Sequence, residues 1–326
     1  MQELHVGRQR HLLPLALGAT ALVVALKWPT LHDPHYWDAL GCYVPQARFF
    51  AEHGFDLGAY KTLSYVRPPL LSILLGYLMR ATGGSREALH LAMFGFTALL
   101  LMATFAIARA LRASQGTALL AALLCFVAPP VFAQAGLVQS DLPAAAFVAT
   151  AWALLLHRHT AGFVIVATLA VLTKESGYAI CPPAALLLYL RAPGGRPPLF
   201  SLRTVRAAWV AGIPCVVLAL WLFAHQKLTG AAMLDDHKSA IGPGALHFAF
   251  FHNFIDSGRF ALWTLAGLAI VRAYRELPAA PARTELLLTA LFAAGLPLLF
   301  PTWLPRYMLS SLPMLAALSA LGAATL

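Results

Sequence analysis

A short polar stretch between residues 32 and 38 holds the densest group of side chains that could do chemistry. It reads His32-Asp33-Pro34-His35-Tyr36-Trp37-Asp38, so two carboxylates and two histidines stand close together. Such groups can serve as a general base, and the same donors could bind a divalent metal cation. Two close histidines without further ligands are common by chance, so no metal ligand is assigned and a divalent cation stays open as a cofactor. A polar loop with interfacial aromatic anchors is the alternative.

Further charged side chains stand at the ends of apolar runs. Asp141 opens one run and could serve a ligand or simply cap a helix. Lys174 and Glu175 separate two short runs, and they could form an anionic-ligand site or neutralise each other. Arg67 and Arg306 each end an apolar run, where a guanidinium could hold a phosphate or extend to lipid headgroups.

The chain that carries these groups is too apolar for a water-soluble fold. Of its 326 residues, 60% are hydrophobic and 11% are charged, and the mean hydropathy is +0.72. Soluble domains have about 25% charged residues, so the composition excludes a cytosolic enzyme and predicts a polytopic helical membrane protein. The net charge of +10 comes from dispersed basic residues, which argues against nucleic acid as a partner. The four cysteines show no metal or redox spacing.

The apolar runs predict an all-α transmembrane bundle of about ten spans. The run from residue 68 to 79 is excluded, because twelve residues reach roughly 18 Å of a hydrocarbon core about 30 Å thick. We therefore expect juxtamembrane helices in a first outer loop, 29–87, and a second outer loop at 226–257. The expected spans are 12–28, 88–107, 116–133, 142–156, 161–174, 177–190, 207–225, 258–271, 286–300 and 308–326.

Charge distribution gives this bundle an orientation. With a cytoplasmic N-terminus, the inner segments hold twelve arginines against three glutamates, as the positive-inside rule requires. Ten of the thirteen acidic residues then fall on the outer side. We expect one membrane domain over 1–326 without a soluble C-terminal domain, and a site facing outward. In the second outer loop, residues 248–255 suit an interfacial helix or a buried packing helix.

Several of these segments resemble the GT-C glycosyltransferases, within them the branch of protein O-mannosyltransferases and lipid A aminoarabinose transferases. The carriers of the resemblance appear in family order and cover about residues 1–195 well. They are Trp37-Asp38 followed by Tyr43-Val44-Pro45, then Arg67-Pro68-Pro69-Leu70, Gln134 with Asp141, Leu172-Thr173-Lys174-Glu175, and Arg306-Tyr307 with Pro313.

The resemblance implies an inverting sugar transfer from a polyprenyl-phosphate donor to a lipid, glycan or protein acceptor at the outer face of a bacterial inner membrane. Asp38 would be the general base, with Asp33 as its rival, and Asp141 a second acid that orients the sugar or acceptor. Arg67, Lys174, Glu175, Arg306 and Tyr307 would bind substrate and phosphate. The sequence departs from the family at Ala39, where an acid is usual, and at Gly136, where an arginine is expected.

Two functions of other classes stay open at this point. The protein could be a lipid or solute transporter, although no pair of related halves with interrupted helices is evident. It could also bind polyprenyl phosphate without catalysis, since one expected phosphate contact is missing at Gly136.

Overall fold

The chain forms helices in each of the ten predicted spans. The computed structural model describes residues 12–61, 67–191, 198, 201–230, 243–276, 280–299 and 305–326, and these contain no strand. The all-α prediction is confirmed. The helices in question are α2 (Leu12–Lys27), α6 (Arg86–Ala110), α7 (Gln115–Val127), α9 (Asp141–Leu156), α10 (Thr160–Thr173), α11 (Cys181–Leu190), α12 (Leu202–Thr229), α14 (Arg259–Glu276), α15 (Ala280–Leu299) and α16 (Leu312–Ala323).

Helix length separates these elements into two groups. Among the described residues, α6 and α12 are long and apolar enough to cross a membrane. A third span results if the bent pair His247–Phe254 and Asp256–Arg275 counts as one. With 25 residues, α6 is about 37 Å long, more than the hydrocarbon core requires. Several other apolar helices have 10–17 residues, so the number of about ten spans stays a prediction.

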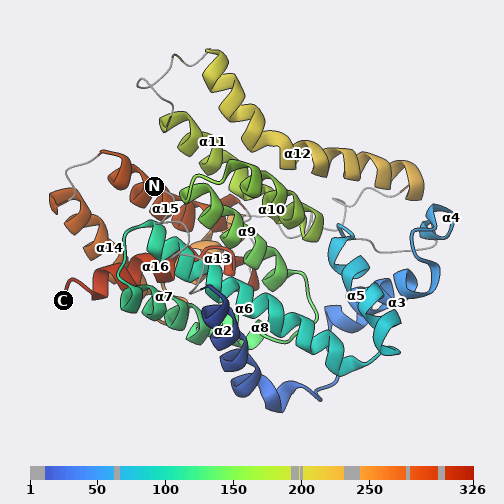
Figure 1. Cartoon of the computed structure of the whole chain (residues 1–326). Coiled ribbons are helices and arrows are strands. Elements are labelled where there is room, and N and C mark those ends of the chain that lie inside the picture. The colour runs from blue at the N-terminus through green and yellow to red at the C-terminus, as the bar shows by residue number, and fades with distance from the viewer. Residues whose placement is uncertain are drawn as a thin grey trace.

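Helices α9 and α16 are buried along most of their length, and α9 lies in the middle of the bundle in Figure 1. Both are apolar on all sides, as expected for a helix surrounded by others. Helix α9 packs against α6 and α10, and α16 packs against α14, α7 and α6. Gly322 permits a close approach of α16 to α14, since a Cβ there would lie 1.8 Å from the carbonyl oxygen of Leu265.

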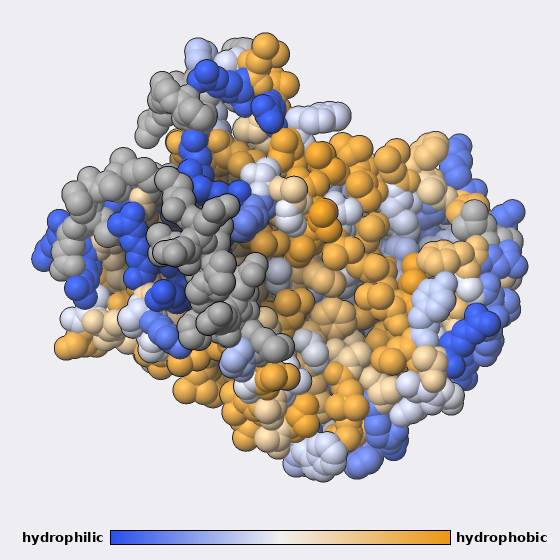
Figure 2. Space-filling view, viewed as in Figure 1, coloured by the Kyte–Doolittle hydropathy of each residue, from blue (hydrophilic) through white to orange (hydrophobic). Residues whose placement is uncertain are grey.

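The surface of the bundle is apolar across its middle. Figure 2 shows hydrophobic residues over most of one face, with hydrophilic residues gathered toward its two sides. Helix α12 contributes much of this exposed apolar surface, including Trp209, Leu220 and Phe223. A water-soluble protein would bury such side chains, whereas a lipid environment accommodates them.

The run that is too short to span forms a helix packed beside the bundle. After η1 (Trp28–Thr30), the chain forms η2 (Ala39–Tyr43), α3 (Val44–His53), α4 (Leu57–Tyr60) and α5 (Leu70–Thr82). Helix α5 packs against α3, and Gly76 lets them meet because a Cβ would lie 2.7 Å from the Ala47 carbonyl oxygen. This pair stands at one side of the molecule in Figure 1.

The segment predicted as an interfacial or packing helix forms α13 (Pro243–Phe254), followed by η5 (Asp256–Gly258). Its polar Asn253 is buried, and the Asn253 carbonyl accepts a hydrogen bond from Trp263 Nε1 at 2.8 Å. Phe248 and Phe251 are exposed instead. Asn253 therefore faces protein, whereas Phe248 and Phe251 face outward, which suits contact with lipid.

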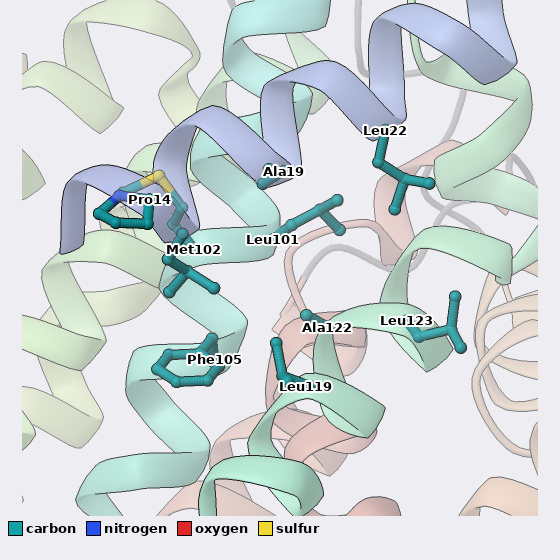
Figure 3. A pocket seen from close by; sticks show the side chains of 11 residues that line it. Pro14, Ala19, Leu22, Leu101, Met102, Phe105, Leu119, Ala122 and Leu123 are labelled. Atoms are coloured by element: carbon teal, nitrogen blue, oxygen red, sulfur yellow. The ribbon is translucent and has the colours of Figure 1, made fainter. Parts of the chain in front are cut away.

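An apolar cavity of about 280 Å³ lies between α2, α6 and α7 (Figure 3). Ala19, Leu101, Phe105, Leu119 and Leu123 are among the side chains around it. No charged side chain lines this cavity, so chemistry has to be sought elsewhere.

Candidate active site

Asp38 is presented by an unusual turn of the backbone. Trp37 has a φ of +49°, in the left-handed region that bulky residues rarely adopt, and the π-helical turn η2 begins directly after Asp38. Backbone hydrogen bonds from Ala39 N to Tyr36 O and from Gly41 N to Trp37 O close this turn. The Asp38 side chain remains 42% exposed, so a ligand can reach it.

Asp141 is the first residue of α9 and is buried, with 5% of its side chain exposed. The N-cap position belongs to Ser140, so the interpretation of Asp141 as a simple helix cap is wrong. A carboxylate at this end of a helix is favoured by the macrodipole. Its Oδ1 instead accepts a hydrogen bond from Lys174 Nζ at 2.5 Å.

A break in the helical path separates the side chains of Lys174 and Glu175. Helix α10 ends at Thr173, Lys174 is extended with φ −153° and ψ 137°, and the 3₁₀ turn η3 (Glu175–Ile180) follows. Lys174 thus binds Asp141, while Glu175 Oε1 accepts a hydrogen bond from Arg67 Nη1 at 2.7 Å. Each of these sequence neighbours thus has an oppositely charged partner from a distant segment.

Arg306 joins the two acidic side chains. It lies in η6 (Pro305–Met308), and its Nη1 is 2.7 Å from Asp38 Oδ2. Its Nε is 4.0 Å from Asp141 Oδ2, and its Nη1 also donates to Gln139 Oε1 at 3.4 Å. One continuous chain of charged contacts consequently joins four segments that are distant in sequence. Its members are Asp38, Arg306, Asp141 and Lys174.

The pair of Arg67 and Glu175 lies near this chain of contacts, with Cys42 and Tyr43 beside both. Burial raises the pKa of the Cys42 thiol to about 12, and the charges of Arg67, Asp38 and Glu175 all act on it. Tyr43 shares a 2.5 Å hydrogen bond with Ser140 Oγ. Burial, and next the charge of Asp141, raise the pKa of Tyr43 well above its usual value, so its hydroxyl stays protonated.

The contacts of Asp33 differ from those of the other predicted site residues. The Asp33 carbonyl oxygen lies 3.1 Å from His90 Nε2, and its charge acts on Lys27 at the end of α2. Asp38, by contrast, contacts Arg306 directly. The side chain of Tyr307, the remaining predicted phosphate contact, lies outside the described residues.

The donors for a divalent cation do not assemble in the described ranges. No group of three or more His, Cys, Asp and Glu side chains there could hold a metal ion. Asp38 and Asp141 are paired with Arg306 and Lys174 instead. The described residues therefore do not fit a metal ion in this arrangement.

Sequence reasoning missed three groups that contact the site. Gln139 binds Arg306, while Ser140 and Tyr43 bind each other within the buried part of the site. The available signal was the run of three polar residues, Gln139 to Asp141, directly before an apolar helix. Neutral polar side chains carry no charge pattern, so their partners could not be read from sequence.

The site balances three cations against three carboxylates. The direct pairs are Arg67 with Glu175, Lys174 with Asp141, and Arg306 with Asp38. Asp38 and Arg306 are the more exposed pair, at 42% and 24%, whereas the other two pairs are largely buried. In such an exposed pair the carboxylate can take a proton from one ligand group, and the guanidinium can bind the negative charge of another.

No protein-family model and no characterised protein sequence matches the chain. Solved structures do resemble it. ArnT from Cupriavidus metallidurans bound to undecaprenyl phosphate is 18% identical with a TM-score of 0.69, covering 98% of this chain and 60% of that one. The archaeal oligosaccharyltransferase AglB from Archaeoglobus fulgidus, in complex with an inhibitory peptide and a dolichol-phosphate, is 15% identical with a TM-score of 0.64.

That second match covers 98% of this chain and 50% of AglB. The chain therefore spans only about half to three fifths of the length of these two proteins. Both similar proteins are GT-C glycosyltransferases, the class that the sequence resembles. The likeness extends over nearly the whole described chain, including the parts beyond residue 195, where the sequence resemblance was loose. The chain has the GT-C fold.

Proposed function

We propose that this protein is a membrane glycosyltransferase that moves a sugar from a polyprenyl-phosphate donor to a hydroxyl-bearing acceptor. The observation that carries the proposal is the convergence of Asp38, Arg306, Asp141 and Lys174 in one cluster of contacts. Support comes from ArnT, which has the same fold and was solved with undecaprenyl phosphate bound. The hydrophobic surface on the face shown in Figure 2 suits a donor that is delivered within the membrane.

In this proposal Asp38 is the general base. Its carboxylate takes the proton of the acceptor hydroxyl as that oxygen forms a bond to the anomeric carbon of the sugar. The bond from the anomeric carbon to the phosphate oxygen breaks, and the polyprenyl phosphate leaves with the electron pair. A single displacement of this kind inverts the anomeric configuration. The exposure of Asp38 favours it over Asp141, which is buried and holds Lys174 in place.

The three cations stabilise the charge that develops on the departing phosphate. Preorganised donors aimed at developing charge are the largest single contribution in many enzymes. Arg306 is the most exposed of the three, and it has a specific further role in the proposal. A donor phosphate that binds Arg306 competes with Asp38 for the guanidinium. Binding of the donor therefore releases the Asp38 carboxylate to act as a base.

The orientation expected from charge distribution completes the proposal. The site would face the outside of a bacterial inner membrane, with the N-terminus in the cytoplasm, because the inner segments are rich in arginine. The sugar, either a hexose or a pentose, and the acceptor, either a lipid, a glycan or a protein, are not specified by the site.

The test uses purified protein in nanodiscs with a panel of polyprenyl-phosphate sugars, and it measures the release of free polyprenyl phosphate. Asp38→Asn should lower kcat by about 10²- to 10⁴-fold, the range typical of a lost general base. Asp33→Asn is the matched control, a nearby carboxylate in the same loop, and it should retain activity. The opposite result would make Asp33 the base. Lipid binding without release from any donor would instead favour a binding or transport protein.

A further inference from the structure

His90 connects the two loops that carry the site carboxylates. It lies near the start of α6 and is buried, with 3% of its surface exposed. Its Nδ1 is 2.6 Å from the carbonyl oxygen of Gly136, and its Nε2 is 3.1 Å from the carbonyl oxygen of Asp33. Asp33 precedes Asp38 by five residues, and Gly136 precedes Asp141 by five. The ring of His90 therefore contacts both the loop that precedes Asp38 and the loop that precedes Asp141.

The two partners of His90 determine its protonation state. Carbonyl oxygens can only accept hydrogen bonds, so each ring nitrogen must donate one. A neutral imidazole has a single N–H group, and its other nitrogen would point a lone pair at a carbonyl oxygen. Only the imidazolium form satisfies both contacts in this buried position.

The charges around His90 are compatible with a proton on its ring. The ring of His35 stacks on it at a centroid distance of 5.1 Å. Burial, followed by the charges of His90 and Arg86, lowers the pKa of His35, so His35 remains neutral. Of the other charged groups on these elements, Glu87 faces His32 and Arg86, and Lys27 interacts with Asp33. On the Gly136 side the neighbours are the uncharged Phe94 and Thr30.

The backbone at Gly136 is adapted to this contact. Its φ is +101°, and a Cβ at this position would lie 2.8 Å from Phe94 Cε1. An arginine, which the family resemblance predicted here, would be strained in this conformation and would collide with Phe94. The departure at Gly136 thus has a local physical reason, since the residue offers its carbonyl oxygen to His90 rather than a side chain to a phosphate.

We propose that the His90 imidazolium is a positioning group, which fastens the Asp38 loop to the Asp141 loop and sets the distance between the two carboxylates. Loss of the proton would remove one of the two contacts and loosen Asp38 relative to Arg306 and Asp141. This role rests on the proposed glycosyl transfer only for its kinetic consequence. The protonation state and the two contacts can be tested without any substrate.

The first experiment is nitrogen-15 NMR of the histidine side chains in the full chain in nanodiscs. We expect one histidine with both ring nitrogens protonated at neutral pH, and this signal should be absent in His90→Gln. His157→Gln is the matched control, because His157 Nε2 contacts the carbonyl oxygen of Ala106 at the far end of α6 from His90. His35→Phe retains a ring stacked on His90, so it should change the chemical shift of the His90 signal without removing the signal. This change assigns the signal to His90 even if His90→Gln does not fold.

The second experiment is the pH profile of donor cleavage. His90→Gln should lower kcat by about 10- to 100-fold, as expected from a misplaced catalytic group, with KM for the donor within about twofold. The wild type should lose activity with rising pH over the range in which NMR shows the loss of the second ring proton of His90. In His90→Gln this alkaline decline should disappear, whereas His157→Gln should keep the wild-type profile.

These two readouts distinguish the possible failures. A neutral His90 ring at a pH where the protein is active would overturn the positioning role, as would wild-type kcat and an unchanged pH profile in His90→Gln. If no donor is cleaved by the wild type, the glycosyl transfer is refuted and the NMR result still decides whether His90 is the charged link between the loops.

Discussion

The two ends of α9 both carry charged clusters, yet they use their charges differently. At the start of the helix, Asp141 binds Lys174 and lies near Arg306, which in turn holds the exposed Asp38. At its other end, Arg191 Nη1 donates to the carbonyl oxygen of Leu155, and Arg191 Nη2 donates to that of Leu156 at 3.0 Å. Arg191 Nε also binds Glu285 Oε1 at 3.1 Å.

The donors of Arg191 are therefore committed to the protein itself. They satisfy carbonyl groups at the C-terminus of a helix, where a cation is also favoured by the macrodipole. Both Arg191 and Glu285 are largely buried. At the other end, the contact between Arg306 and Asp38 is partly exposed and can be exchanged for a ligand. Charges that complete a helix stabilise the fold, whereas charges that pair with one another near solvent remain available for chemistry.

The largest effect should follow from removing Lys174. Lys174→Met leaves the Asp141 carboxylate buried without its nearest cation, and breaking a buried pair costs about 3–5 kcal/mol of unfolding free energy. Donor cleavage should be lost as well. Thermal unfolding in detergent and the nanodisc assay measure the two effects. Lys174→Arg, which keeps the charge, is the control and should retain most of the stability.

A double substitution sharpens this result by separating stability from function. Replacing both partners, as in Asp141→Leu with Lys174→Met, removes the buried cation and the buried anion together, and such replacements are often neutral or stabilising. The double variant should therefore unfold near the wild-type temperature and still cleave no donor. Wild-type activity in this variant would show that the pair belongs to the scaffold, as Arg191 and Glu285 do.

The opposite pattern is expected at the other end of α9. Arg191→Met removes a salt bridge and two bonds to helix carbonyl groups, and should lower the unfolding free energy by about 2–4 kcal/mol. The folded fraction should retain wild-type kcat, because Arg191 lies at the far end of α9 from the site. Thermal unfolding and activity per folded molecule measure this. A loss of kcat larger than the loss of folded protein would contradict the comparison.

Much of this arrangement could be predicted from sequence, but the pairing of its members could not. Apolar runs and charges at their ends predicted the helices and placed Asp38, Asp141, Lys174 and Arg306 among the candidates. The partner of Lys174 was not predictable, because an extended backbone at this residue lets its side chain reach Asp141, which is 33 residues away in sequence. His90 was missed for a different reason. A single histidine inside an apolar run gives no indication that two carbonyl oxygens from distant loops converge on it.

The smallest effect should come from a helix start that carries no site residue. Ser85 caps α6, and its Oγ accepts a hydrogen bond from Ala88 N at 3.2 Å. Ser85→Ala should lower the unfolding free energy by about 1 kcal/mol, the usual cost of a lost N-cap, and thermal unfolding would measure it. Donor cleavage should be unchanged, because Ser85 bonds to Ala88 N and Glu87 Oε2 at the start of α6, whereas Asp141 begins a helix and also binds Lys174. A lower kcat in Ser85→Ala would show that the start of α6 is coupled to the site. The coupling would then act through His90, which lies on the next turn of the helix.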